Sequence, residues 1–246
     1  MSVFIFAIGS VLAAAAPVDS TPKIVVEGYG EVQTPPNVAR FAYEMRGEGK
    51  SSDEALKELV ASAARVESSL LALDPAIQPK SGNLSVVGVR GTDCKTERYD
   101  DTPRLSTGPC AIVGYLAKQT FTASTEKVGD VGTMVGLAGR NGATEPEMMG
   151  FDLSDSKPAK NRAIATALAD ARAKAEAMAR GSGVALGPMI TASLDGARED
   201  GDEAIVVTGS RLVRPELDAP TPVTVTVAPK AIETSARVTV TYAVQR

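Results

Sequence analysis

Alternating apolar and polar positions mark several strands along the chain. The clearest case is Ile232 to Val244, where Val238, Val240, Tyr242 and Val244 fall on one face and polar or small residues on the other. Val38 to Arg46 alternates in the same way, so each run predicts a half-buried strand. The predicted strands cover residues 23–32, 38–46, 82–90, 111–124, 147–153, 184–194 and 232–244. Because Pro35-Pro36-Asn37 marks a turn, we expect the first two strands to form a hairpin.

Two long stretches instead repeat apolar residues every three or four positions, which predicts helices. The first begins at Ser51, where Ser51 and Glu54 have capping-box spacing, and it ends at Asp74-Pro75. Its predicted inner face holds Leu56, Leu59, Val60, Ala63, Val66, Leu70 and Leu73. The second runs from about Pro158 to Arg180, before Gly181 and Gly183, with a mostly small inner face of Ala163, Ile164, Ala167, Leu168, Ala171, Ala175, Met178 and Ala179.

A third, short helix is predicted from Val128 to Leu137. It contains several glycines, and we expect close packing against a sheet to be the reason, since glycine otherwise weakens a helix. Paired strands interspersed with helices predict an α+β fold, a mainly antiparallel sheet or sheets covered by two long helices and one short helix. The order of elements also allows a loose internal duplication, although no sequence repeat demonstrates it.

The N-terminus predicts export. An apolar run from Val3 ends in Leu12-Ala13-Ala14-Ala15-Ala16-Pro17, so residues 1–16 are interpreted as a signal peptide, although no Lys or Arg precedes the run. A short N-terminal anchor is the alternative. No later segment is long and apolar enough to predict a membrane span. The net charge of -4 gives no basic surface for a nucleic-acid partner.

Two cysteines flank a polar loop. Cys94 and Cys110 lie at the ends of a segment rich in Thr, Asp, Arg, Gly and Pro, between two predicted strands. In an oxidising compartment this placement predicts a disulfide that closes the loop. Two free thiols or a two-cysteine metal site are the alternatives. Because the chain has no histidine, carboxylates alone would have to complete such a metal site.

Little in the sequence predicts catalysis or a cofactor. The lack of histidine excludes Ser-His-Asp and Cys-His arrangements, and the glycine pairs lack a dinucleotide-binding fingerprint. Asp152 and Asp155 could form an acid–base pair. We favour instead that Ser154, Asp155 or Ser156 caps the following helix. The loop acids could bind a hard cation weakly, but solvated carboxylates are the simpler interpretation: Asp100-Asp101, Glu199-Asp200 and Asp202-Glu203. We therefore predict no catalytic, cofactor or metal residues.

Several segments together resemble one family. They are Ile24–Gly30, Gly114-Tyr115, Gly150–Asp155, Asp170–Ala179, Gly183–Gly187 and Val238–Tyr242. In this order and spacing they resemble the SIMPL-domain proteins, a group of secreted bacterial envelope proteins that includes a periplasmic oxidative-stress defence protein and a surface antigen. The resemblance covers residues 23–246. The long loop 94–110 and an insertion at about 195–222 depart from the usual pattern.

The resemblance implies a non-enzymatic periplasmic protein, with outer-membrane association as one option. It also implies a role in envelope or oxidative-stress protection through self-association or contact with other envelope proteins. Two other functions remain open. A ring or channel subunit would expose a large apolar or strand-edge surface on the monomer. A carboxylate-based enzyme would bring two acids together in a concave pocket.

Overall fold

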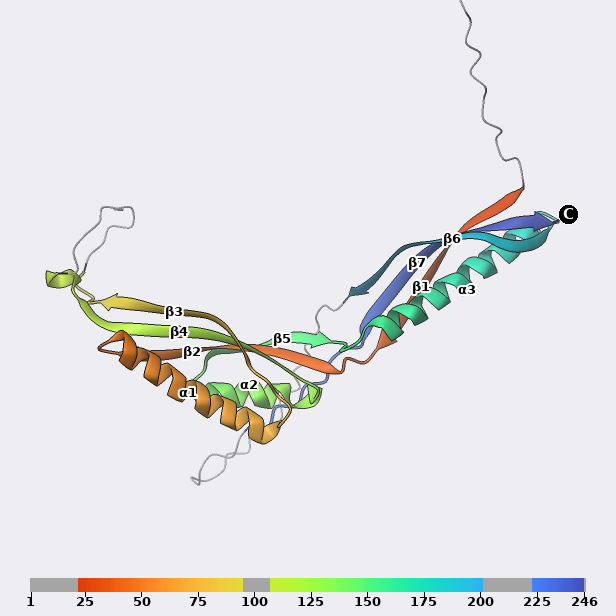
Figure 1. The fold of residues 1–246 in the computed structure, drawn as a ribbon. Coiled ribbons are helices and arrows are strands. Elements are labelled where there is room, and N and C mark those ends of the chain that lie inside the picture. The colour runs from red at the N-terminus through yellow and green to blue at the C-terminus, as the bar shows by residue number, and fades with distance from the viewer. Residues whose placement is uncertain (1–21, 95–106, 201–222, 246) are drawn as a thin grey trace, which may run out of the picture.

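The structure is a computed structural model that describes residues 22–94, 107–200 and 223–245, with only the backbone described at residues 199 and 200. Within this part of the chain it contains two antiparallel sheets and three α-helices (Figure 1). The elements are β1 (Lys23–Thr34), β2 (Val38–Gly49), α1 (Ser52–Leu73), β3 (Lys80–Arg90), β4 (Ile112–Thr125), α2 (Val131–Arg140), β5 (Thr144–Asp152), α3 (Lys157–Gly181), β6 (Ala185–Asp200) and β7 (Ile232–Gln245), with 3-10 turns at Gly108–Cys110 and Val128–Asp130. The predicted order of strands and helices is confirmed. The predicted signal peptide lies outside the described residues, as do most of the 94–110 loop and residues 201–222 of the insertion.

The strands divide between two sheets. Sheet A has the order β1-β7-β6, and sheet B has the order β3-β4-β2-β5. The predicted hairpin between the first two strands is therefore wrong, because β1 pairs with β7 while β2 pairs with β4 and β5. Pro35 and Pro36 lack the N–H groups that a tight hairpin uses, and here they carry the chain from sheet A into sheet B.

In sheet A, α3 covers β1 and β7 through a face of alanines at four-residue spacing. Ala163, Ala167, Ala171 and Ala175 are fully buried, and together with Val26, Val238 and Val240 they form one core. Two glycines of β1 allow this close approach: a Cβ at Gly28 would lie 2.0 Å from the carbonyl oxygen of Ala167, and a Cβ at Gly30 would lie 2.1 Å from that of Ala163. Small residues on both elements therefore bring helix and sheet into backbone contact.

In sheet B, α1 and α2 lie on one face and enclose a second core. Phe41, Tyr43 and Phe121 stack there, with ring centroids 6.1 and 5.2 Å apart. Ser51 caps α1 as predicted, because its Oγ accepts a hydrogen bond from the Glu54 N–H at 3.2 Å. Glycine is again the contact point, since a Cβ at Gly47 would lie 2.2 Å from the carbonyl oxygen of Ala55.

Several details differ from the sequence prediction. Val60 and Met178, assigned to inner helix faces, are more than half exposed, at 63% and 51%. The predicted loop from Asp195 is in fact the end of β6 as far as Asp200, paired with β7 across a register shift at Gly196. Close packing explains two glycines of the short helix, since a Cβ at Gly132 would meet Val225 and a Cβ at Gly139 would lie 3.3 Å from Pro146, whereas Gly129 and Gly136 face open space. Nothing in the structure establishes the internal duplication, which stays a prediction.

The two sheets lie end to end and give the molecule an elongated shape (Figure 1). Their two cores share no residue. At the junction, Asn37 and Ser154 exchange two hydrogen bonds of 2.8 Å, which tie the β1–β2 connection to the β5–α3 connection. The segment before β7 also packs on the sheet B half, where Val225 N–H donates to Thr133 Oγ1 at 3.0 Å.

Candidate functional site

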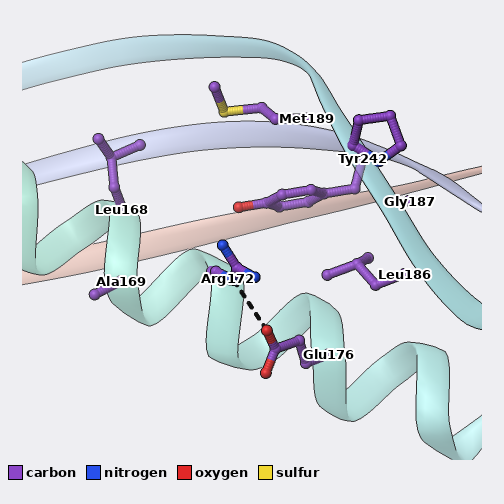
Figure 2. A pocket seen from close by; sticks show the side chains of 9 residues that line it. Leu168, Ala169, Arg172, Glu176, Leu186, Gly187, Met189 and Tyr242 are labelled. Atoms are coloured by element: carbon purple, nitrogen blue, oxygen red, sulfur yellow. Dashed lines mark hydrogen bonds and ion pairs between the residues drawn. The ribbon is translucent and has the colours of Figure 1, made fainter.

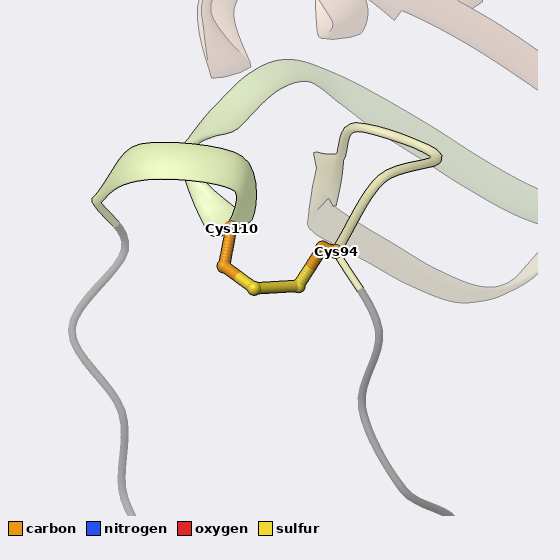
Figure 3. Close-up of a disulfide and its surroundings, with 2 residues drawn as sticks. All are labelled: Cys94 and Cys110. Atoms are coloured by element: carbon orange, nitrogen blue, oxygen red, sulfur yellow. A yellow bond between two sulfur atoms is a disulfide. The ribbon is translucent and has the colours of Figure 1, made fainter.

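β3 and β4 pair along their length, and we call these two strands, residues 80–90 and 112–125, the β3–β4 arm. The predicted disulfide is present at the tip of this arm. Cys94 and Cys110 are joined with their Cα atoms 4.6 Å apart (Figure 3). Cys94 follows β3, and Cys110 ends the 3-10 turn that precedes β4. The bond therefore fixes the ends of the two strands to each other, and neither sulfur is available as a thiol or a metal ligand.

The arm itself exposes apolar side chains. All eleven residues of β3 are exposed, including Leu84 and Val87 at 53% and 48%. Alternation along the strand places Leu84 and Val86 on one face and Val87 and Val89 on the other. Ile112 and Val113 extend this surface onto β4. An exposed apolar surface of this kind is typical of a site that contacts a protein or membrane partner.

A groove lies between α3 and β6 in the sheet A half, with a volume of about 530 Å³ (Figure 2). Leu168, Leu186 and Met189 supply much of its apolar lining, and the ring of Tyr242 lies among them. It arises because α3 lies over β1 and β7, which leaves the α3-facing side of β6 only partly covered. Sequence periodicity gave no sign of this groove, since which strand a helix covers depends on the tertiary arrangement.

The polar side of the groove is an ion pair on α3. Arg172 Nε lies 3.0 Å from Glu176 Oε1, one helical turn away. The Glu176 carboxylate accepts this hydrogen bond and raises the pKa of the Arg172 guanidinium above its ordinary value. Among the described lining residues, Arg172, Glu176 and Tyr242 are the ionisable ones. This composition suits binding of an amphipathic group.

Asp152 and Asp155, the alternative acid–base pair of the sequence analysis, contact different groups. Asp152 forms an ion pair and a hydrogen bond with Arg40 across the edge of sheet B. Asp155 Oδ1 instead accepts the Lys157 N–H at 2.9 Å, at the first residue of α3. Asp155 thus acts at the helix start, as the capping interpretation expected, whereas the Ser156 side chain makes no capping bond. The loop acids of the sequence prediction lie outside the described residues, or, at Glu199 and Asp200, have no described side chain.

A charged cluster on the outer face of sheet B was missed by the sequence prediction. Glu44 accepts a hydrogen bond from Arg46 Nε at 2.7 Å and lies 3.8 Å from Lys118 Nζ. The hydrogen bond from Arg46 lowers the pKa of the Glu44 carboxyl. The alternation in β2 was the available signal, because residues two apart share a face. These charges pair with each other, so the cluster stabilises the sheet surface rather than offering a reactive group.

The described residues contain no group of three or more His, Cys, Asp or Glu residues placed to hold a metal ion. None of the helices within the described ranges is long and apolar enough to cross a membrane.

Comparison with known proteins supplies a family. A search of curated proteins finds no match to this chain. A family model described as "SIMPL: Protein of unknown function (DUF541)" matches residues 24–242, which include both sheets, all three helices, the β3–β4 arm and the α3–β6 groove. The chain therefore belongs to the SIMPL family.

Proposed function

We propose that this SIMPL protein acts in the cell envelope by binding proteins, including further copies of itself, and catalyses no reaction. One observation carries the proposal: the β3–β4 arm exposes apolar side chains on both of its faces. Burying such a surface is favourable by roughly 25 cal/mol per Å² of apolar area. A partner that covers both faces at once would gain from each of them.

Two features support an envelope location. The apolar run from Val3 to the small residues at Ala13–Ala16 is typical of a signal peptide that is removed after export. The bond between Cys94 and Cys110 is typical of proteins from an oxidising compartment such as the periplasm. We propose the periplasm as the location and protection of the envelope against stress as the role, the latter from the family resemblance alone.

A ring or channel subunit is the second candidate. It is favoured by the position of β3 at the edge of sheet B, where a further strand can pair with it. A contact between different surfaces of two copies can close into a ring, whereas a contact between identical surfaces gives a two-fold dimer. The two candidates therefore differ in the number of copies that assemble.

The test is the solution mass of the mature protein, from Pro17 onward, by light scattering after size exclusion under non-reducing conditions. We expect a discrete oligomer whose population rises with concentration. A dimer favours a two-fold contact, and a larger discrete assembly favours the ring. A monomer at every concentration would contradict self-association and leave binding to other envelope proteins as the function to test.

A further inference from the structure

Each sheet has two edges, and an edge strand presents backbone groups that another chain can pair with. The described edges are β1 and β6 in sheet A and β3 and β5 in sheet B. Proteins normally obstruct such edges with charged side chains, prolines, bulges or covering elements. The four edges of this chain differ clearly in this respect.

Side chains of α3 block the edge of β1. The Tyr29 N–H donates to Asp170 Oδ2 at 2.8 Å, and Lys174 Nζ donates to the Glu27 carbonyl oxygen at 3.1 Å. Asp170 and Lys174 also pair with each other at 2.7 Å. Two backbone groups that an additional strand would need are thus already bonded.

Irregular backbone blocks β5 and β6. In β5, Pro146 lacks an N–H, Glu145 has a positive φ of 52°, and the pairing with β2 shifts register twice. In β6, Pro188 lacks an N–H and Gly196 has a φ of 144°. The pairing of β6 with β7 shifts register at three places. An incoming strand would meet a broken ladder at either edge.

The edge of β3 is less obstructed, because its pairing with β4 shifts register only toward the two ends of the strand, between Ser81 and Leu84 and between Val89 and Arg90. From Ser81 to Val89 it contains no proline and no charged residue, and from Leu84 to Val89 it pairs with β4 in unbroken register. No described residue pairs with its outer edge. A strand that fits it must offer apolar side chains on both faces, because β3 does so itself.

We propose that β3 pairs antiparallel with β3 of a second copy and joins two copies of sheet B into one eight-stranded sheet. The inference rests on the proposed self-association and names the surface that carries it. The partner that matches apolar residues on both faces of β3 is β3 itself, and an antiparallel pairing of identical strands is a two-fold contact. The disulfide supports it by holding the end of the strand against β4.

Charge disfavours one register of this pairing. β3 carries charge only at its ends, on Lys80 and Arg90. A register that placed Lys80 opposite Arg90 of the partner would set like charges against each other, which destabilises a strand pair. A register centred on Val87 avoids this, since it places Val87 opposite its own copy and Ser85 opposite Val89. Val87 also lies opposite Leu116 of β4, so the apolar surface continues across the contact.

The test compares the oligomeric states of two variants. Each variant replaces a valine of similar exposure with lysine. Val87→Lys puts two like charges at the centre of the contact, and we expect the dimer to weaken at least tenfold. Val25→Lys is the control, because Val25 is exposed to a similar degree, 52% against 48%, but lies on β1, whose edge is blocked. We expect this control to associate as the wild type does. Circular dichroism and thermal unfolding of each monomer verify that both variants fold.

A mixing experiment tests whether the contact includes Val87. Val87→Lys and Val87→Glu should each be monomeric, whereas an equimolar mixture should form a dimer, because opposite charges then face each other. If the wild type associates and Val87→Lys does too, the β3 contact is wrong while self-association stands. If the wild type is monomeric at every concentration, self-association fails, and the β3 contact fails with it.

Discussion

At the scale of single residues, two buried threonines differ in whether their hydroxyl groups have a partner. The Thr133 hydroxyl in α2 accepts from the Val225 N–H at 3.0 Å and donates to the Val225 carbonyl at 3.3 Å. Thr234 in β7 is 0% exposed, and within the described residues its Oγ1 is the buried side-chain oxygen without a hydrogen-bond partner. An unpaired buried hydroxyl costs about 1–3 kcal/mol.

We therefore expect Thr234→Val to raise the free energy of unfolding by about 1 kcal/mol, because a methyl group of similar shape replaces the unpaired hydroxyl. Thr133→Val should lower it by about 1 kcal/mol, because the Val225 N–H loses its acceptor. Urea unfolding of the two variants beside the wild type measures both changes. A loss of stability in Thr234→Val would contradict the assignment of an unpaired hydroxyl.

Tyr43 makes stability depend on alkaline pH. Burial against Phe41 and Phe121 raises the pKa of its phenol to about 12, from an ordinary value of 10.0. The fold thus favours the neutral phenol, and this contribution is complete below pH 10 and is lost as the pH rises toward 12. At pH 11 the wild type should lose about 1.4 kcal/mol more than Tyr43→Phe, relative to pH 8. Parallel pH dependences in urea unfolding of the two proteins would contradict this origin.

At the scale of elements, the packing of α3 on β1 depends on glycine. A Cβ at Gly28 would lie 2.0 Å from the Ala167 carbonyl oxygen and 2.8 Å from the Ala171 Cβ, both held by a regular helix. We expect Gly28→Ala to destabilise the protein by about 3 kcal/mol, since backbone must move to accommodate it. Gly136→Ala is the matched control: its Cβ meets open space inside α2, and the helix should gain up to about 1 kcal/mol. Chemical denaturation of both variants gives the comparison.

The sequence predicts the elements themselves better than it predicts how the strands pair. Their order and type followed from periodicity, and the strict alternation of β7 correctly marked Val238, Val240 and Tyr242 as buried. Strand pairing did not follow, because a local turn at Pro35–Asn37 says nothing about β7, which lies some 200 residues further along and holds β1 in sheet A. The last residues of β6 were predicted as loop because glycine and acids are rare in strands, yet pairing with β7 overrides that preference.

Some features of the candidate surfaces could be predicted from the sequence and others could not. The Cys94–Cys110 bond was predictable, because both residues flank one loop and their pairing needs only local geometry. The α3–β6 groove and the open β3 edge were not, because each depends on what a distant element leaves uncovered. The Asp170–Lys174 pair illustrates this: in sequence it is an ordinary i,i+4 ion pair, and only the fold places it on the backbone of β1.

At the scale of the whole molecule, the two sheets form two cores that share no residue. Polar contacts such as the Asn37–Ser154 pair tie them at the junction, and the Val225 segment anchors the chain before β7 to α2. Exposed polar contacts contribute little compared with a buried core. The two halves should therefore unfold as separate cooperative units.

Substitutions confined to one core test this independence. Phe41→Ala removes a fully buried ring from the sheet B core and should cost about 3–5 kcal/mol there, whereas Gly28→Ala should destabilise only the sheet A half. We expect calorimetry to show two transitions, of which each variant lowers a different one. Hydrogen exchange should then assign the transitions, with Phe41→Ala accelerating exchange in β2 and β4 while β7 stays protected. If either substitution lowered a single common transition and accelerated exchange equally in both sheets, the junction would couple the halves more strongly than its contacts imply, and any partner bound at β3 would stabilise sheet A as well.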